Sequence, residues 1–135
     1  MSWLVDTNVI SELSRKAPHA GVSQWLVEHQ DDLFLSVLTL GELEKGLMQA
    51  TDAIRKARLA RWIRKDVPEW FEGRILPVDE RVAIRWGQLV GSLRNPVPAI
   101  DTLLAATALT HQLTLATRNT ADLGRTGADI FNPWD

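Results

Sequence analysis

The sequence predicts an α/β fold, a three-layer α/β/α sandwich with a mostly parallel central sheet. Short β-type apolar runs alternate with longer segments of helical spacing, a pattern typical of parallel sheets covered by helices. The run 33–37 is almost entirely apolar, as expected of a strand that is buried on both faces. With 135 residues and no internal repeat or linker, the chain is expected to form one domain, 1–135.

The first half of the chain predicts two strands and three helical segments. The apolar run Leu4–Val5 stops at an acidic residue, as expected of a buried strand that carries a carboxylate to the rim of a sheet. Thr39 is the expected N-cap of the longest helix, with Glu42 in capping-box register and a break near Thr51. In chain order, the expected elements are a strand at 4–5, helices at 9–13 and 18–30, a strand at 33–37 and a helix from 39 to about 71.

The second half predicts three more strands and two more helices. Asp79 is the expected N-cap of a helix with an apolar stripe at helical spacing. Two prolines stiffen the loop 95–98, and the helix that follows is rich in alanine, which allows close packing against a sheet. In chain order, the expected elements are a strand at 75–78, helices at 79–93 and 100–112, and strands at 113–117 and 129–131.

Composition excludes several classes of protein. A net charge of −2 and a pI near 5.9 give no overall attraction to nucleic acid or anionic membranes, so any nucleic-acid role must rest on local charge. The absence of cysteine excludes disulfides and thiolate metal sites and favours a reducing cytoplasm. No secretory signal is apparent, and no run approaches the ~18 apolar residues of a membrane span. We therefore expect a cytoplasmic protein with no membrane segment.

Four acidic residues are expected at one edge of the sheet. Asp6 follows the first strand, Glu42 and Asp101 lie in the first turns of predicted helices, and Asp122 follows the fourth strand. The carboxyl ends of parallel strands and the helix N-termini that follow them share one edge, where ligands of open α/β sheets bind. The sequence therefore predicts that these four carboxylates face one cleft.

Such a cluster favours a hard divalent cation. Two carboxylates about 5 Å apart repel by roughly 3 kcal/mol at an effective dielectric near 20, so the site must protonate, stay hydrated or bind cations. Oxygen ligands without His or Cys suit Mg²⁺ or Mn²⁺. In a phosphodiesterase, such an ion activates water and neutralises charge on the phosphate.

Each acid also has a purely structural interpretation. Asp6 and Asp122 are candidates for turn or cap residues, and Asp101 for a residue that complements a helix dipole. Glu42 is a candidate for a capping-box partner, a role that conflicts with a place in the cleft. The functional interpretation is favoured because all four acids are expected at the same edge of the sheet.

Four short motifs surround the acids: Asp6-Thr7-Asn8, Thr39-Leu40-Gly41-Glu42, the segment 101–108, and Thr117-Arg118-Asn119 followed by Asp122. In combination they resemble the PIN-domain family, and within it the VapC and FitB type toxins of bacterial type II toxin–antitoxin pairs. The resemblance extends from Leu4 to the ending Asn132-Pro133-Trp134, although many relatives have Phe where this chain has Leu123.

The resemblance implies a magnesium- or manganese-dependent endoribonuclease that a small cognate antitoxin holds inactive. It implies that the antitoxin also binds operator DNA and that the toxin forms a homodimer. It further implies that the four acids are the metal-binding and catalytic residues, with Thr7 and Asn119 as polar neighbours of the site.

Several other charged and aromatic residues have both a functional and a structural interpretation. The basic stretch 55–65 places Arg58, Arg61 and Lys65 on one face, which suits either a solvated surface or an RNA backbone. Lys45 and Arg118 lie nearer the proposed cleft and are the better candidates for RNA phosphate binding. The remaining expectations are surface or cap roles for His19, His29 and His111, core packing for Trp25 and Trp86, and solvated positions for Glu12 and Glu44.

Three rival functions remain in view. A Mg-dependent phosphatase of the haloacid-dehalogenase type needs a second Asp two residues after the first, where this chain has Asn8. A phospho-receiver module fits Asp79 at the end of the third strand but needs an acidic pair at the first strand and a Lys after the last. A catalytically inactive PIN-like domain that only binds its antitoxin or RNA is the third.

Overall fold

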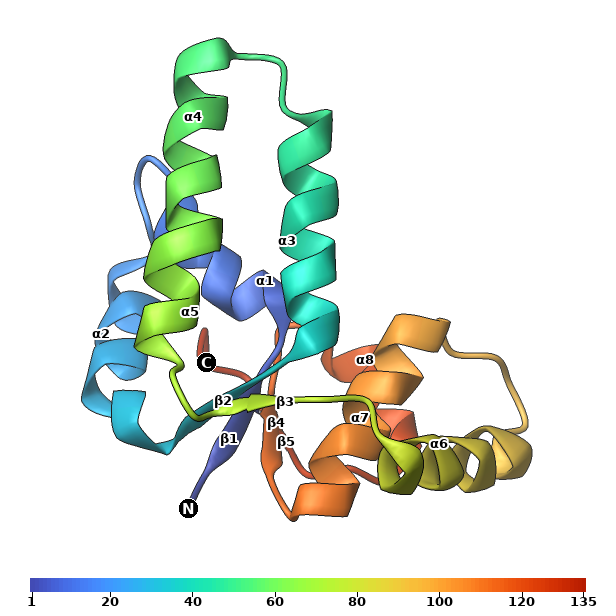
Figure 1. The fold of residues 1–135 in the computed structure, drawn as a ribbon. Helices are drawn as coiled ribbons and strands as arrows, with labels where there is room; N and C mark the ends of the chain where they lie inside the picture. The colour runs from blue at the N-terminus through green and yellow to red at the C-terminus, as the bar shows by residue number, and fades with distance from the viewer.

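A five-stranded parallel sheet lies between two layers of helices in the computed structural model, which describes residues 1–135 (Figure 1). Every strand pairing is parallel, so the α/β sandwich predicted from the sequence is confirmed. The strands, in sheet order, are β3 (Ile75–Leu76), β2 (Leu33–Ser36), β1 (Trp3–Val5), β4 (Thr114–Ala116) and β5 (Ile130–Phe131).

The two helical layers cover opposite faces of the sheet. One layer contains α1 (Thr7–Ile10), α2 (Ala20–Glu28), α3 (Val37–Gln49), α4 (Ala53–Arg61) and α5 (Val67–Trp70), with 3-10 turns at Ser11–Ser14 and Gln30–Asp32 and a π-helical turn at Trp62–Asp66. The other contains α6 (Glu80–Ser92), α7 (Ala99–His111) and α8 (Thr120–Leu123), with a 3-10 turn at Gly124–Thr126. No helix is both long enough and apolar enough to cross a membrane.

The strands supply side chains to both layers because successive residues of a strand point to opposite faces. In β1, Trp3 and Val5 pack with the first layer and Leu4 with the second. In β2, Leu35 joins the first layer and Phe34 packs against the second. A strand buried on both faces has no polar side, which explains the continuous apolar runs in the sequence.

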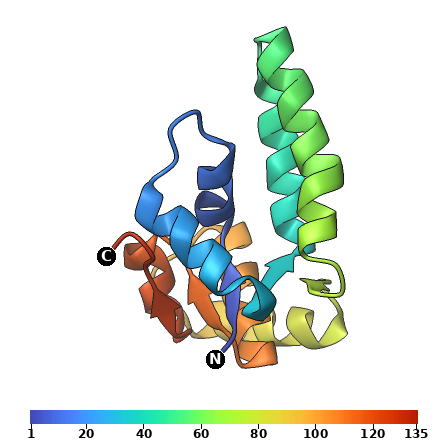
Figure 2. The same ribbon diagram turned by 90° about the vertical axis from the view of Figure 1, so that its left-hand side faces the viewer.

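Helices α3 and α4 form a hairpin that extends beyond the carboxyl edge of the sheet (Figures 1 and 2). The predicted break near Thr51 is confirmed, because α3 ends at Gln49 and α4 begins after Asp52. The Asp52 carboxylate caps α4 by accepting the backbone N–H groups of Ile54 (3.0 Å) and Arg55 (3.4 Å).

Two helix starts differ from the prediction. The N-cap of α3 is Ser36, whose hydroxyl accepts the backbone N–H of Leu38 at 3.1 Å, so Thr39 as N-cap and Glu42 as its capping-box partner are wrong. The helix α1 begins at Thr7 rather than Val9. Both errors have one cause: each helix follows its strand directly, so the last strand residue or the next one serves as the cap.

The strand order reverses between β1 and β4. From β1 the chain moves outward to β2 and β3, and it then returns to add β4 and β5 on the other side of β1. In open α/β sheets, ligands bind at the point where the strand order reverses in this way. Asp6 follows β1, and Thr117 follows β4, at this point.

Candidate functional site

Asp6 is the most buried acid at the carboxyl edge, with a side chain that is only 5% exposed. One carboxylate oxygen accepts the backbone N–H of Thr7 at 2.7 Å, which caps α1. The other accepts the hydroxyl of Thr117 at 2.7 Å and the Nδ2 amide of Asn8 at 3.3 Å. Three donors therefore fix the orientation of this carboxylate.

Glu42 reaches the same edge from α3. Its Oε1 accepts the hydroxyl of Thr7 at 2.5 Å, and that hydroxyl also lies 3.3 Å from the hydroxyl of the buried Thr39. The contact turns Glu42 towards β1 instead of back to the start of its own helix. Thr7 thus joins the first two acids, since its N–H binds Asp6 and its side chain binds Glu42.

Asn119 joins the other two acids. Its Nδ2 donates to Asp101 at 3.2 Å and lies 3.5 Å from Asp122, while its backbone N–H donates to the hydroxyl of Thr117 at 3.0 Å. Asp122 also forms an ion pair with Arg125 at 3.1 Å, and both of these side chains are about 40% exposed. Asp122 therefore lies at the solvent side of the group.

The acids influence one another electrostatically. Burial raises the pKa of Asp6 to about 6, with smaller contributions from the charges of Asp101 and Glu42, and the hydrogen bonds from Thr117 and Thr7 oppose this increase. Burial also raises the pKa of Asp101, followed by the charges of Asp122 and Glu42. Together with the hydrogen bonds through Thr7 and Asn119, these effects indicate that the four carboxylates form one cluster of negative charge.

The donor set of this cluster suits a hard divalent cation. All its donors are oxygens, and no Lys or Arg forms an ion pair with Asp6, Glu42 or Asp101. No group of three or more His, Cys, Asp or Glu side chains is arranged to hold a metal ion by itself. Mg²⁺ commonly binds through one or two carboxylates and keeps several waters, so this arrangement fits a hydrated ion.

The two predicted RNA-binding residues lie in different surroundings. Lys45 is exposed one turn beyond Glu42 on α3, and both line a small pocket of about 410 Å³ with Ile100. The backbone N–H of Arg118 donates to Asn8 Oδ1 at 3.2 Å, but its guanidinium lies over the ring of Trp134, 4.8 Å from the ring centroid. The charge of Arg118 is therefore directed towards the chain end.

Two side chains at the site were missed as functional candidates from the sequence. Thr117 and Asn8 supply two of the three donors to Asp6, and Asn8 Nδ2 also lies 3.4 Å from Thr117 Oγ1. The available signal was position: Thr117 directly follows β4, as Asp6 directly follows β1. A polar residue at the end of a neighbouring parallel strand is a candidate contact for that reason.

Glu12 is buried rather than solvated, which corrects the expectation from the sequence. Its side chain is 4% exposed and accepts the backbone N–H of His19 at 2.8 Å and Arg15 Nη1 at 3.2 Å. The bond from His19 is the main cause that lowers the pKa of Glu12. Glu12 therefore ties the loop 15–19 to the 3-10 turn after α1.

The remaining expectations hold for some residues and not for others. Glu44 is exposed on α3 and paired with Arg64 through bonds of 2.9 and 3.1 Å. Trp25 packs against the first core cluster as expected, but Trp86 is only partly buried, belongs to neither core cluster and instead donates to Thr102 across α6 and α7 at 2.9 Å. His19 caps the start of α2 and His29 its end, as expected, but His111 is the last residue of α7 and its Nε2 is buried without a hydrogen-bond partner, so a surface or cap role for His111 is wrong.

Comparisons with known proteins agree with this architecture. Residues 3–128 match the PIN domain. The chain is 37% identical to the toxin FitB of Neisseria gonorrhoeae over 97% of each protein, and 32% identical to the VapC ribonuclease Y4jK of Sinorhizobium fredii over 98% of this chain and 97% of that protein. The crystal structure of FitAcB from Neisseria gonorrhoeae superposes with a TM-score of 0.89 at 37% identity, covering 98% of both chains.

A structure of FitAB bound to an IR36 DNA fragment gives the same TM-score of 0.89 at 35% identity, over 98% of this chain and 96% of that chain. The parallel sheet, the acids at its carboxyl edge and these matches along nearly the whole chain lead to one assignment. This protein belongs to the PIN domain family.

Proposed function

We propose that this protein is a divalent-metal-dependent endoribonuclease that acts as the toxin of a toxin–antitoxin pair in the cytoplasm. The observation that supports the proposal best is the buried Asp6 carboxylate, which is oriented by three donors and shares its edge of the sheet with Glu42 and Asp101. A relative that is 32% identical over nearly the full chain is named a ribonuclease, and another that is 37% identical is named a toxin.

Asp6, Glu42, Asp101 and Asp122 are the proposed metal-binding and catalytic residues. Mg²⁺ or Mn²⁺, when bound, would lower the pKa of a water and offset the negative charge of the phosphate in the transition state. The chain's own polar residues hold the acids in place for this task. Thr7, Asn8 and Thr117 orient Asp6, and Asn119 holds Asp101 close to Asp122.

The proposed partners are an RNA substrate, a small cognate antitoxin that binds operator DNA, and a second copy of this chain. The basis for the antitoxin is the likeness to FitB, whose complex with its partner FitA has been solved on a DNA fragment. A short reading frame next to this gene that encodes a DNA-binding fold with a disordered tail would support the pairing, and an isolated gene would count against it.

RNA cleavage by matched variants tests the catalytic assignment. Asp6→Asn keeps the shape of the side chain but removes its charge, and Asp31→Asn makes the same change at an exposed position in the 3-10 turn Gln30–Asp32. The wild type and Asp31→Asn should cleave RNA with Mg²⁺ or Mn²⁺ and not with EDTA, and both should arrest growth when expressed. Asp6→Asn should do neither, so full toxicity of Asp6→Asn would overturn the assignment.

A further inference from the structure

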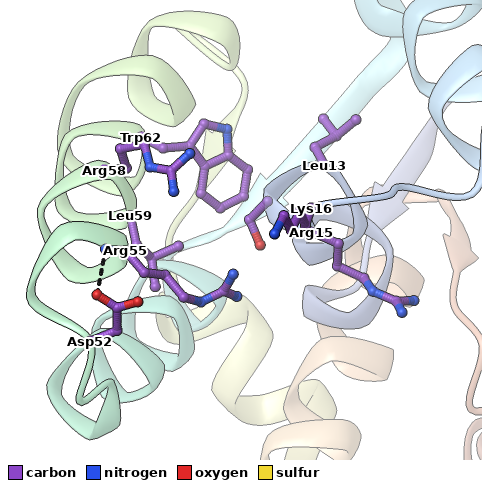
Figure 3. Close-up of a pocket in the computed structure, with 9 residues that line it drawn as sticks. Leu13, Arg15, Lys16, Asp52, Arg55, Arg58, Leu59 and Trp62 are labelled. Carbon is purple, nitrogen blue, oxygen red and sulfur yellow. Dashed lines mark hydrogen bonds between the residues drawn. The ribbon is translucent and has the colours of Figure 1, made fainter.

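A basic groove lies between the α3–α4 hairpin and the segment that follows α1. Its cavity has a volume of about 480 Å³. In Figure 3, Arg55, Arg58 and Trp62 face it from α4 and the π-helical turn, and Arg15 and Lys16 lie on the opposite side. We propose that this groove binds the sugar–phosphate backbone of a single-stranded RNA beyond the site of cleavage, an inference that rests on the proposed ribonuclease function.

The charge of the groove is unbalanced. Four cationic side chains line it, against the single carboxylate of Asp52, in a chain whose net charge is −2. The Asp52 carboxylate is occupied by the backbone N–H groups at the start of α4, as the dashed line in Figure 3 shows for one of them. Of the four cations, only Arg15 forms an ion pair, with Glu12. Lys16, Arg55 and Arg58 are therefore free to meet an anion.

The arrangement of the cations fits a linear polyanion better than a small one. Arg55 and Arg58 are three residues apart on α4, which is about 4.5 Å along the helix axis, and Lys16 belongs to the opposite wall. Positive charges on both walls of a groove can follow successive phosphates. The ring of Trp62 adds an apolar surface on which a base can stack without sequence preference.

The groove lies on the same side of the sheet as the acids. Each wall follows a helix that contributes to the acidic site. The segment with Arg15 and Lys16 follows α1, which begins at Thr7, and α4 follows α3, which contains Glu42. From Glu42 to the end of α3 at Gln49 the helix rises about 10 Å, and α4 follows after the turn. An RNA strand with its scissile phosphate at Asp6 would therefore reach the groove by extending along the hairpin.

The basic residues that line the groove differ from those that the sequence predicted as a possible RNA-binding face. Arg58, Arg61 and Lys65 were expected to share a face, yet only Arg58 lines the groove, together with Arg55. Arg64 is engaged by Glu44. Arg61 and Lys65 do not line the groove, and both are exposed on the same helical segment. Replacing these two residues therefore removes the same charge as the groove variant does and serves as its control.

Binding of a fluorescent oligouridine of about 12 nucleotides, followed by anisotropy at several salt concentrations, tests the proposal. All proteins carry Asp6→Asn so that RNA is not cut. The groove variant is Arg55→Ala with Arg58→Ala, and the control is Arg61→Ala with Lys65→Ala. All four positions are exposed, so both variants should fold, and their circular dichroism and melting curves verify this.

The groove variant should bind roughly tenfold or more weakly than its parent, and the slope of log K against log salt should fall by about 1.4, since each phosphate contact on a single strand contributes about 0.7. The control should stay near the parent. Equal losses in both variants, or no loss in either, would overturn the proposal. So would unchanged RNA binding with a loss of binding to an oligoglutamate peptide, which would assign the groove to an acidic protein segment.

A second readout separates this proposal from the proposed function. With Asp6 restored, the groove variant should still cleave a dinucleotide or trinucleotide at the wild-type rate, and the value of KM should rise only for the longer RNA. If Asp6→Asn fails to abolish cleavage, the proposed catalytic assignment falls, while the binding comparison, repeated in EDTA so that the RNA stays intact, still tests the groove.

Discussion

Asp6→Asn should stabilise the metal-free protein at neutral pH, although it removes the central residue of the proposed site. Asp6 is 5% exposed, and burial raises its pKa from the ordinary value of 3.8 to about 6. A carboxylate that ionises in such surroundings destabilises the folded state, whereas the amide of Asn carries no charge. The ionised Asp6 that the proposed function requires therefore lowers the unfolding free energy of the wild-type protein.

The magnitude follows from the pKa. Each pKa unit corresponds to about 1.36 kcal/mol, so the increase to about 6 means that ionised Asp6 costs about 3 kcal/mol of unfolding free energy. The folded state holds the proton more tightly than the unfolded chain does. The stabilising contribution of protonated Asp6 is therefore fully present below about pH 3.8 and is lost as the pH rises to about 6.

Urea denaturation of both proteins in EDTA at several pH values between 4 and 7.5 measures this effect. The unfolding free energy of Asp6→Asn minus that of the wild type should increase with pH by about 3 kcal/mol, with most of the change below about pH 6. Part of the gain is offset, because the new amide faces Asn8 Nδ2, which is also a donor. A difference that is constant with pH, or that falls as the pH rises, would refute the reasoning.

Three further predictions concern residues around the site and the fold. Thr117→Val removes the hydroxyl that donates to the buried carboxylate and should lower the unfolding free energy at pH 7.5 by about 2 kcal/mol in urea denaturation; an unchanged midpoint would show that the bond contributes nothing. Glu12→Ala should release the loop 15–19 and speed its cleavage by trypsin, whereas Glu44→Ala, which breaks only an exposed ion pair, should not, and equal rates would contradict this. Gln112 ends α7 with a φ of +57°, so replacing it with Gly should raise the unfolding free energy by about 0.5–1 kcal/mol, and a lower melting temperature would argue against strain there.

Local patterns in the sequence predicted much of the fold. The apolar run at 33–37 predicted a buried strand and the segment 113–117 predicted a further strand, and the structure has β2 and β4 there. Asp79 was predicted as a helix cap and accepts the backbone N–H of Val82 at 3.0 Å. Such features depend on neighbours within a few residues, so periodicity and residue type reveal them.

The helix starts next to strands were less predictable. Thr39 has the composition of an N-cap, but Ser36 takes that role because β2 runs into α3 without a loop. Thr39 is instead buried beside Thr7. Whether Ser36 or Thr39 caps the helix depends on whether a loop separates the strand from the helix, and a single sequence does not show where the strand ends to within a few residues.

Local spacing in the sequence was enough to predict the alternation of strands and helices and the positions of Asp6 and Asp101 at the starts of helices, whereas Glu42, which was expected in the first turn of its helix, lies in the second turn of α3. The tertiary structure alone decided which groups meet these acids, since Asp6 and Thr117 are 111 residues apart and Thr7 and Glu42 are 35 apart. It also decided that Glu12 is buried and that Arg55 and Arg58 line a groove with Lys16. Burial and long-range contacts arise only when the helical layers pack on the sheet, and no periodicity in the chain encodes them.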